Sequence, residues 1–433
     1  MAQLDSTKLG FLLCTGICTL IFIFLSLILP NGTNNLKQLT FTKTECGVYP
    51  DEICAALFED NDAAIKLGEG CQKLYGTTLS DFEKPTNCSQ LIEDLHIITS
   101  PLSEEEANYP LAYIITIHKE KEMFVKLLSA IYAPQNVYCI HTDNKSSEEL
   151  KNIVRTLTAC FGNVFIPTKT ETVVYAGFSR LQADINCMKD LVQSETSWKH
   201  VINVCGQDYP LKTNKEIIQY IKSKWNGKNI TPGIIQPKHF RYRTQFRYKE
   251  NLGPKEYFVS RVPGEKTKAP HNLTIYFGTA YYVLFRPFVE FILKDTRALD
   301  LLEWSRDAYS PDEHYWVTLN RLEDAPGSTP NAEWEGSVRA IKWKDQEGIL
   351  FDKCKGHYIR DICVYGSGDL KWIIQSQSLF ANKFELSTYP LTIVCLERRY
   401  RIKVLQEAEV PIQPQWHLQK NVYFDMKLNS SKK

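Results

Sequence analysis

The sequence has almost no excess of charge of one sign, because 51 Lys and Arg residues are balanced by 50 Asp and Glu residues for a formal net charge of +1. This balance argues against a large basic surface that binds the phosphate backbone of a nucleic acid, but it leaves room for a local basic site. Hydrophobic residues make up 43% and charged residues 23% of the 433 residues, which excludes disordered and fibrous classes. The length predicts about two to three domains.

Familiar nucleotide signatures are also missing. The sequence contains no Walker loop, no G-x-G-x-x-G motif and no internal repeat at a fixed period, so a phosphate-loop nucleotide fold is not expected. The only Asp-x-Asp motif is Asp60-Asn61-Asp62, which precedes the first predicted strand of the core. It cannot meet a nucleotide from there, and we interpret it as a solvated acidic turn.

One long apolar run is present, from Phe11 to Leu29, and it predicts a membrane anchor. The run has no charged residue and would reach about 28 Å as a helix, close to the thickness of a bilayer core. Lys8 precedes it and no basic residue follows before Lys37, so the positive-inside rule puts the rest of the chain across the membrane. A cleaved signal peptide is the alternative, but its apolar region would be shorter and no small-residue cleavage site follows this run.

The predicted parts of the chain are a cytoplasmic tail (1–9), a transmembrane signal anchor (10–30), a stem with a cysteine-bearing region (31–100) and a luminal domain (101–433). Of the 13 cysteines, Cys14 and Cys18 lie in the apolar run. The others would lie in an oxidising space, where most should form disulfides, and their odd number leaves at least one unpaired or intermolecular. Candidate N-glycosylation sites are Asn31, Asn87, Asn144, Asn229, Asn272 and Asn429.

After residue 100, short apolar runs typical of buried strands alternate with segments of helical periodicity. The predicted strands are 111–118, 137–143, 164–166 and 200–205, and the predicted helices are 122–132, 147–160 and 177–192. This alternation predicts an α/β fold with a parallel or mixed sheet. Ligands of such sheets bind beyond the carboxyl ends of the strands, where the polar residues are Thr116, His118, Asp143, Lys145, Gln207 and Asp208.

Several long motifs together resemble one family. They are Ala130-Ile-Tyr-Ala-Pro-Gln-Asn-Val-Tyr-Cys-Ile-His-Thr-Asp143, Leu181-Gln-Ala-Asp-Ile-Asn-Cys-Met188, Cys205-Gly-Gln-Asp-Tyr-Pro210, Ser310-Pro-Asp-Glu-His314, Gly366-Ser-Gly-Asp-Leu370 and Leu379-Phe-Ala-Asn-Lys-Phe384. In this order they resemble the β-1,6-N-acetylglucosaminyltransferases that make core 2 and I-type branches, over nearly all of 101–395. The resemblance implies a GT-A-type fold, with a mixed sheet flanked by helices, in a type II Golgi membrane protein. It also implies UDP-GlcNAc as donor, inversion at the anomeric carbon and no divalent metal cofactor.

Donor-binding residues follow from the resemblance. Without a metal, side-chain cations must take the charge that develops on the leaving diphosphate. The resemblance assigns this role to Arg360 and Lys383, and it carries Thr116 and Asp143 over as contacts on the uridine side. Taken without the motif context, both cations would be ordinary surface charges.

Glu313 is the predicted catalytic base. An inverting transfer needs a carboxylate that takes the proton of the acceptor hydroxyl as it attacks, and the resemblance places Glu313 there. Local sequence favours another interpretation, because Ser310-Pro311-Asp312-Glu313 fits a capping box with Ser at the N-cap and Glu at N3. The two roles are compatible, since a helix N-terminus favours an ionised Glu.

The expected cysteine pairing rests on the chemistry of an oxidising compartment and on the family resemblance. Cys354, His357 and Cys363 invite a zinc interpretation, but in an oxidising lumen without a second ligand pair a hairpin disulfide is favoured. That disulfide would hold Arg360 rigidly. The family pattern further implies Cys54–Cys395, Cys88–Cys160 and Cys139–Cys187, with Cys205 as a free thiol. Cys46 and Cys71 remain, and their pairing with each other is a guess that no motif supports.

Acceptor recognition is the least defined feature. Trp343 resembles the family's acceptor-stacking Trp, with a core tryptophan as the alternative. Core 2 enzymes carry a Tyr two residues later and a Glu at the position of Thr231, whereas this chain has Asp345 and Thr231, which is closer to the I-branching members. The basic aromatic stretch 240–249 is interpreted as an acceptor-side loop or a solvated face, and not as a nucleic-acid site.

The predicted function is therefore transfer of GlcNAc in β-1,6 linkage to a galactose- or GalNAc-containing glycan on a glycoprotein or glycolipid. Two alternatives stay open: a transferase of the same fold with another donor such as UDP-xylose, and a catalytically silent, lectin-like or regulatory paralogue. The oligomeric state is not defined by the sequence.

Overall fold

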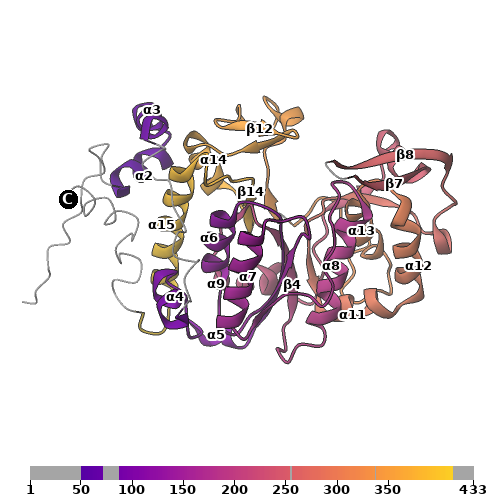
Figure 1. Ribbon diagram of the computed structural model, residues 1–433, viewed down its shortest axis with the longest axis horizontal. Coiled ribbons are helices and arrows are strands. Elements are labelled where there is room, and N and C mark those ends of the chain that lie inside the picture. Colours follow the sequence, from indigo (N-terminus) through magenta and orange to yellow (C-terminus); the bar gives the residue numbers. More distant parts are fainter. Residues whose placement is uncertain (1–49, 72–86, 254–255, 337, 413–433) are drawn as a thin grey trace, which may run out of the picture. The chain divides into compact units, whose positions relative to one another are not determined.

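The computed structural model describes residues 50–71, 87–253, 256–336 and 338–412 (Figure 1). The predicted cytoplasmic tail and anchor, residues 31–49 and 72–86 of the predicted stem region, Asn31, Asn429 and Cys46 lie outside these residues, as does the predicted Cys46–Cys71 pair. Within the described ranges, no helix combines the length and the apolar character needed to cross a membrane.

The centre of the fold is a mixed five-stranded sheet. Its strands, in spatial order, are β10 (Val283–Phe285), β4 (His200–Cys205), β1 (Leu111–Ile117), β2 (Val137–Thr142) and β3 (Val164–Phe165). Four of them are parallel, and β10 pairs antiparallel with β4 at the edge. The predicted α/β class and mixed sheet are confirmed, and β1 to β4 lie where the apolar runs predict strands.

Helices cover both faces of this sheet (Figure 1). One face packs against α6 (Lys121–Ile131), α7 (Glu148–Cys160) and α9 (Asn214–Lys224). The other packs against α8 (Phe178–Leu191), α11 (Arg286–Lys294), α12 (Thr296–Trp304) and α13 (Tyr315–Leu319). Successive side chains of β1 alternate between the two cores, with Tyr113 in the first and Ile114 in the second. Both faces are thus buried, which explains why the strands are continuous apolar runs.

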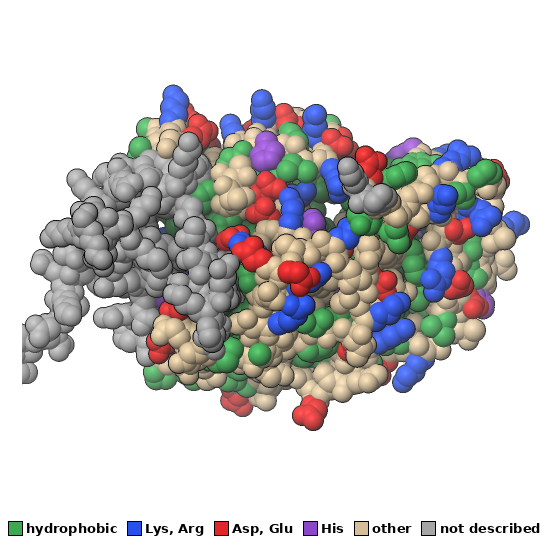
Figure 2. All heavy atoms as spheres, in the orientation of Figure 1, with side chains coloured by type: hydrophobic (Ala, Val, Ile, Leu, Met, Phe, Trp, Pro, Cys, Tyr) green, Lys and Arg blue, Asp and Glu red, His purple; other side chains and the backbone are tan. Residues whose placement is uncertain are grey.

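Smaller sheets accompany the central one, and several of their strands precede β10 in the chain. They are β11 (Arg339–Ala340), β14 (Phe380–Asn382) and β5 (Asp208–Pro210); the pair β6 (Gly233–Ile235) and β9 (Tyr276–Gly278); the ribbon β7 (Phe246–Leu252) and β8 (Tyr257–Glu265); and the hairpin β12 (His357–Ile359) and β13 (Ile362–Val364). The hairpin and the ribbon both lie at the top of the view in Figure 1, and Figure 2 shows basic and hydrophobic side chains mixed over the ribbon. These strands are too short or too exposed for their pattern to predict them.

Three disulfides join elements that are distant in the chain. The remaining helices are α2 (Pro50–Phe58), α3 (Asp62–Cys71), α4 (Cys88–Asp94), α5 (Glu104–Ala107), α10 (Tyr242–Gln245), α14 (Leu370–Gln375) and α15 (Pro390–Glu407). The bonds Cys54–Cys395, Cys88–Cys160 and Cys139–Cys187 join α2 to α15, α4 to α7 and β2 to α8. These are the pairs that the family resemblance implies. Cross-links over such long loops remove much conformational freedom from the unfolded chain.

Candidate active site

The carboxyl ends of β1 and β2 bring Thr116 and Asp143 to the same edge of the sheet. Thr116 lies opposite His141 in the register of the two strands, and the amide of Asp143 donates to the Ile117 carbonyl at 2.9 Å. The buried Asp143 carboxylate accepts hydrogen bonds from the Lys145 amide at 2.9 Å and from Lys145 Nζ at 2.6 Å. The carboxyl ends of the parallel strands therefore carry ordered polar side chains, at the place where ligands of such sheets bind.

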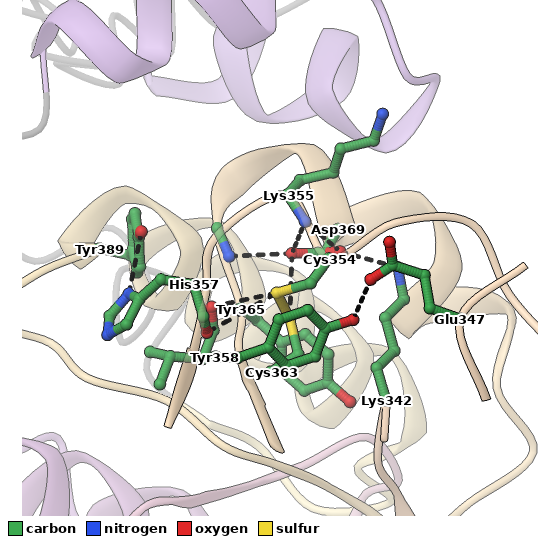
Figure 3. Close-up of a disulfide and its surroundings, with 12 residues drawn as sticks. Lys342, Glu347, Cys354, Lys355, His357, Tyr358, Cys363, Tyr365, Asp369 and Tyr389 are labelled. Atoms are coloured by element: carbon green, nitrogen blue, oxygen red, sulfur yellow. Dashed lines mark hydrogen bonds and ion pairs between the residues drawn. A yellow bond between two sulfur atoms is a disulfide. The ribbon is translucent and has the colours of Figure 1, made fainter. Parts of the chain in front are cut away.

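Arg360 lies at the tip of the β12–β13 hairpin. Ile359 pairs with Ile362, so Arg360 and Asp361 form a two-residue turn, and their φ angles of 51° and 62° are both positive. Such a turn normally favours Asn and Gly, because other side chains are strained at positive φ. The hairpin holds this conformation with Cys354–Cys363, the predicted fourth disulfide (Figure 3). The Arg360 side chain is exposed, and its guanidinium lies 4.3 Å from the centre of the Tyr175 ring.

A buried ion pair lies beneath the hairpin (Figure 3). Lys342 Nζ donates to Asp369 Oδ1 at 2.7 Å, and the amides of Lys355 and Gly366 donate to the same carboxylate at 3.1 and 3.0 Å. Burial raises the pKa of Asp369, while Lys342 and these amides oppose that shift. The carboxylate thus fixes the loop before β12 and the turn after β13 to one point.

Metal-ligating residue types gather in the described ranges only at Cys354, Cys363 and Asp369. The two sulfurs are joined in the disulfide and offer no thiolate, so this cluster is not a zinc site. Asp60 and Asp62 are exposed at the turn between α2 and α3, remote in the chain from the strand ends.

Lys383 follows β14 and lies against the same hairpin. Its amide donates to the Cys363 carbonyl at 3.3 Å, and its carbonyl accepts from the Tyr365 amide at 3.0 Å. Burial lowers the pKa of Lys383, and the charges of Lys119 and Arg360 act in the same direction. Among the described residues, neither Lys383 nor Arg360 forms an ion pair with a carboxylate. The structure therefore brings the two predicted cations together and leaves both without a counter-ion.

Glu313 ends the short 3₁₀-helix η6 (Pro311–Glu313). The capping-box interpretation is wrong: Ser310 has a φ of 46° and its side chain makes no capping hydrogen bond. The reason is tertiary, because the Ser310 amide donates to the Ala176 carbonyl at 2.8 Å and this contact holds the residue away from N-cap geometry. The Glu313 carboxylate is consequently free of any capping role, and its side chain keeps 30% of its surface exposed.

Arg243 forms an ion pair with Glu313. Burial raises the pKa of the Glu313 carboxyl to about 7, with the Asp312 carboxylate acting in the same direction and Arg243 opposing them. A carboxyl with this pKa is partly ionised near neutral pH and can both accept and release a proton there. Arg243 lies in the basic aromatic stretch 240–249, so the sequence contained a signal for this residue. It contained no signal for the ion pair between Arg243 and Glu313.

Tyr175 connects the carboxylate to the cations. Its ring lies under the Arg360 guanidinium, and the charge of Glu313 contributes to the raised pKa of its hydroxyl, whose main cause is burial. Glu313 and Arg360, far apart in the chain, therefore both act on Tyr175, Arg360 by lying over its ring and Glu313 through its charge. Tyr175 is 60% exposed, and no sequence motif marks it as part of the site.

Trp343 lies beside the tip of the hairpin and not in the core. It pairs with Ile362 in an isolated β-bridge, the next amide, of Lys344, donates to the Asp361 carbonyl at 2.8 Å, and 38% of the Trp343 side chain is exposed. Thr231, in contrast, is buried, and its hydroxyl accepts from Asn320 Nδ2 at 2.8 Å and Arg321 Nη1 at 3.2 Å. The Thr231 side chain thus belongs to the structural framework.

Cys205 ends β4 as a free thiol. Asn382 Nδ2 lies 3.2 Å from its sulfur, and burial raises the pKa of the thiol to about 12. The nearby polar residues Gln207 and Asp208 are engaged internally: Gln207 donates to the Phe384 carbonyl at 3.1 Å, and Asp208 pairs with Arg339 at 3.0 Å. These two strand-end residues therefore support the framework around β14.

The sequons differ in accessibility. Asn87, Asn144 and Asn272 are exposed. Asn229 is fully buried, and its amide donates to Asn320 Oδ1 at 2.9 Å and to the Pro326 carbonyl at 3.0 Å. The prediction of Asn229 as a glycosylation site is therefore wrong for the folded protein, because a glycan has no space there.

Comparisons with known proteins show which sequences this chain resembles. The core-2/I-branching enzyme family model matches residues 111–374. A Homo sapiens protein named probable β-1,3-galactosyl-O-glycosyl-glycoprotein β-1,6-N-acetylglucosaminyltransferase 7 is 57% identical over 431 residues, 99% of this chain and 100% of that protein. The Homo sapiens N-acetyllactosaminide β-1,6-N-acetylglucosaminyl-transferase is 52% identical over 366 residues, 84% of this chain and 88% of that protein.

Proposed function

The chain belongs to the core-2/I-branching enzyme family and is a glycosyltransferase, and from this premise we propose that it transfers GlcNAc from UDP-GlcNAc in β-1,6 linkage to a galactose- or GalNAc-containing glycan. The acceptor is an O-glycan or a poly-LacNAc chain on a glycoprotein or glycolipid. The names of the relatives support both the sugar and the linkage.

Glu313 acts as the general base in this proposal. Its carboxylate takes the proton of the acceptor 6-hydroxyl while the oxygen attacks the anomeric carbon, and the bond to UDP breaks with its electron pair leaving on the diphosphate. One displacement inverts the configuration from α to β. The pKa of about 7 supports this role, because such a carboxylate accepts a proton near the operating pH.

Arg360 and Lys383 stabilise the leaving diphosphate in place of a metal ion. The observation that carries the proposal is that these two cations act on each other without an ion-pair partner among the described residues, with Arg360 over the ring of Tyr175, whose hydroxyl has its pKa raised in part by the charge of Glu313. Cations held in advance where negative charge develops lower the barrier without further reorganisation. Thr116 and Asp143 then bind the uridine side at the neighbouring strand ends.

Trp343 stacks on the acceptor sugar. Its exposed side chain next to the hairpin supports this role. Thr231 contributes no carboxylate, and Asp345 replaces the aromatic residue of core 2 enzymes. Both positions favour I-type branching of N-acetyllactosamine chains over core 2 synthesis. The relative of 52% identity is named for N-acetyllactosaminide, whereas the relative of 57% identity is named for a β-1,3-galactosyl-O-glycosyl-glycoprotein.

The protein acts in the Golgi lumen as a single-pass type II membrane protein in this proposal. The uncharged run Phe11–Leu29 and the flanking charges support the anchor. Disulfides on the described chain are in keeping with an oxidising compartment.

A transfer assay tests the proposal. The secreted luminal part, residues 38–433, is incubated in EDTA with UDP-GlcNAc or UDP-xylose and with core 1 and N-acetyllactosamine acceptors, and the products are analysed by mass and linkage. We expect β-1,6-linked GlcNAc on N-acetyllactosamine, without added metal. Product from UDP-xylose alone would identify another donor. Folded protein that binds UDP but forms no product with any acceptor would favour the silent, glycan-binding alternative.

A further inference from the structure

A row of aromatic rings extends from the Glu313–Arg243 ion pair toward the surface. The Arg243 guanidinium lies 4.7 Å from the centre of the Phe240 ring and 5.1 Å from that of Phe277. The rings of Phe240 and Phe277 lie 4.3 Å apart, and Phe277 meets Trp334 edge to face at 6.3 Å. We call Phe240, Phe277 and Trp334 the aromatic row.

The outer end of this row is exposed. Trp334 keeps 49% of its surface accessible, whereas the fully buried Trp198 and Trp316 pack in the core. A large ring that is half exposed and edge-on to another ring contributes less to core packing than these two do. Packing in the core therefore does not account for Trp334, and its exposed ring is accessible to a ligand.

The loop that carries Trp334 is held in place. The Gly233 amide donates to the Glu333 carbonyl at 2.7 Å, and Arg321 Nη2 donates to the Gly233 carbonyl at 3.0 Å and the Thr231 carbonyl at 3.1 Å. The buried Arg321 guanidinium also donates to the Glu333 carbonyl at 3.5 Å, and so joins the loop to β6. Such fixing matters, because a ring that is already positioned loses little conformational freedom when it binds a ligand.

The two strands beneath the row approach each other closely. Gly233 and Gly278 pair in β6 and β9, and a Cβ on Gly278 would lie 2.2 Å from the Pro232 carbonyl oxygen. Only glycine permits this approach, which brings Phe277 of β9 next to the segment that leads to Phe240. The two glycines therefore allow the close strand pairing that positions Phe277 in the aromatic row.

We propose that the aromatic row is an acceptor subsite, with Trp334 stacking on a sugar of the acceptor chain that is not the reacting one. This inference rests on the proposed function and deepens it. Arg243 and Phe277 both lie between Glu313 and Trp334, so a sugar that presents its hydroxyl to Glu313 cannot also cover Trp334. A sugar further along the same glycan can.

The chemistry of the row selects a neutral, extended glycan. Aromatic faces stack on the C–H-rich faces of galactose and GlcNAc rings, and Trp has the largest such face. The three rings of the row are uncharged, and the charges beside them are of both signs: Lys238 and Arg241 flank Phe240, and Glu333 and Glu335 flank Trp334. This mixture gives no preference for an anionic glycan. A chain of neutral hexoses such as poly-LacNAc fits this surface better than a single terminal disaccharide.

Comparison of short and long acceptors tests this subsite. Trp334→Ala is measured with an N-acetyllactosamine disaccharide and with its tetra- and hexasaccharide, alongside Phe258→Ala, which removes an equally exposed ring on β8. We expect Trp334→Ala to raise KM for the longer acceptors about tenfold and to leave kcat, KM for UDP-GlcNAc and KM for the disaccharide unchanged. Trp334→Phe should recover part of the loss.

Direct binding separates failure of the subsite from failure of the proposed function. Binding of the same oligosaccharides to wild type and to Trp334→Ala is followed by ligand-observed NMR in the presence of UDP. Weaker binding of the long glycans alone in the variant would support the subsite even if no transfer occurred. Equal length dependence in wild type, Trp334→Ala and Phe258→Ala would overturn it.

Discussion

Two pairs of basic residues near the hairpin differ in one respect, the presence of a counter-ion. Arg339 and Lys342 are almost fully buried and pair with the buried carboxylates of Asp208 and Asp369 at 3.0 and 2.7 Å. Arg360 lies at the tip of the β12–β13 hairpin and Lys383 directly after β14, and neither forms an ion pair within the described residues. The first pair is thus internally neutralised, whereas the second keeps its charge available.

The difference separates structural from functional charges. A buried ion pair loses hydration and recovers that loss only through its partner, so removing one member is strongly destabilising. Two neighbouring cations without a partner repel each other, and folding alone gives no reason to keep them. An anionic ligand would provide the missing counter-charge, and a nucleotide diphosphate has that charge.

The largest expected effect is at Glu313, where the function should be lost and the fold kept. Glu313→Gln should lower kcat about 10²- to 10⁴-fold, because the general base is removed. UDP affinity and the melting temperature should stay close to wild type. Steady-state kinetics with calorimetric UDP binding check this, with the exposed Glu303→Gln as a control. Near-normal turnover of folded Glu313→Gln would exclude Glu313 as the base.

Substitution of Lys383 should impair catalysis, whereas substitution of Lys342 should impair stability. Lys383→Met should lower kcat about 10²- to 10³-fold with an unchanged melting temperature. Lys342→Met should lower the free energy of unfolding by about 3–5 kcal/mol, because Asp369 is left buried without its partner.

Denaturant unfolding and kinetics on both variants test the comparison. If Lys342→Met unfolded like wild type and Lys383→Met lost stability instead, the distinction between structural and functional charges would be wrong.

Removing the hairpin disulfide should have an intermediate effect on both stability and donor binding. Replacing Cys354 and Cys363 together by Ala should lower the free energy of unfolding by about 2–3 kcal/mol, as expected for a short loop. KM for the donor should also rise, because the turn that positions Arg360 is no longer fixed. Thermal unfolding and donor titration measure the two effects, and an unchanged donor KM would mean that the bond does not position Arg360.

The smallest expected effect is a shift of the pH profile. Glu313 must be ionised to accept a proton, so kcat/KM should rise with pH through its pKa of about 7. Arg243 lowers this pKa, and Arg243→Gln should therefore move the rising limb to higher pH by about one unit. Arg243→Lys should restore most of the wild-type limb. A limb that stays in place in Arg243→Gln would show that the ion pair does not tune Glu313.

Much of the fold was predictable because it depends on local pattern. The alternating apolar segments gave β1 to β4 and the helices between them to within a residue or two. The strands of the hairpin and the ribbon were not predicted, since their pairing depends on contacts distant in the chain. The capping box at Ser310 failed for the same reason, because a contact with the Ala176 carbonyl overrides the local motif.

The site was predictable in its charged members and not in their neighbours. Glu313, Arg360 and Lys383 stand in motifs, and the structure brings them to one region. Tyr175 has no local pattern that sets it apart from a surface residue. Arg243 lies in the basic aromatic stretch 240–249, but its ion pair with Glu313 forms only when the chain folds. Asn229 shows the converse, since its sequon is intact and the fold buries it.

Donor binding without metal is the most direct test of the account. UDP binding to the luminal part is measured by calorimetry in EDTA and in Mn²⁺, for wild type and for a variant with Arg360→Met and Lys383→Met. The account predicts equal affinity of wild type in EDTA and in Mn²⁺, and a large loss of affinity in the variant under both conditions. Binding that requires Mn²⁺, or that survives the loss of both cations, would contradict it.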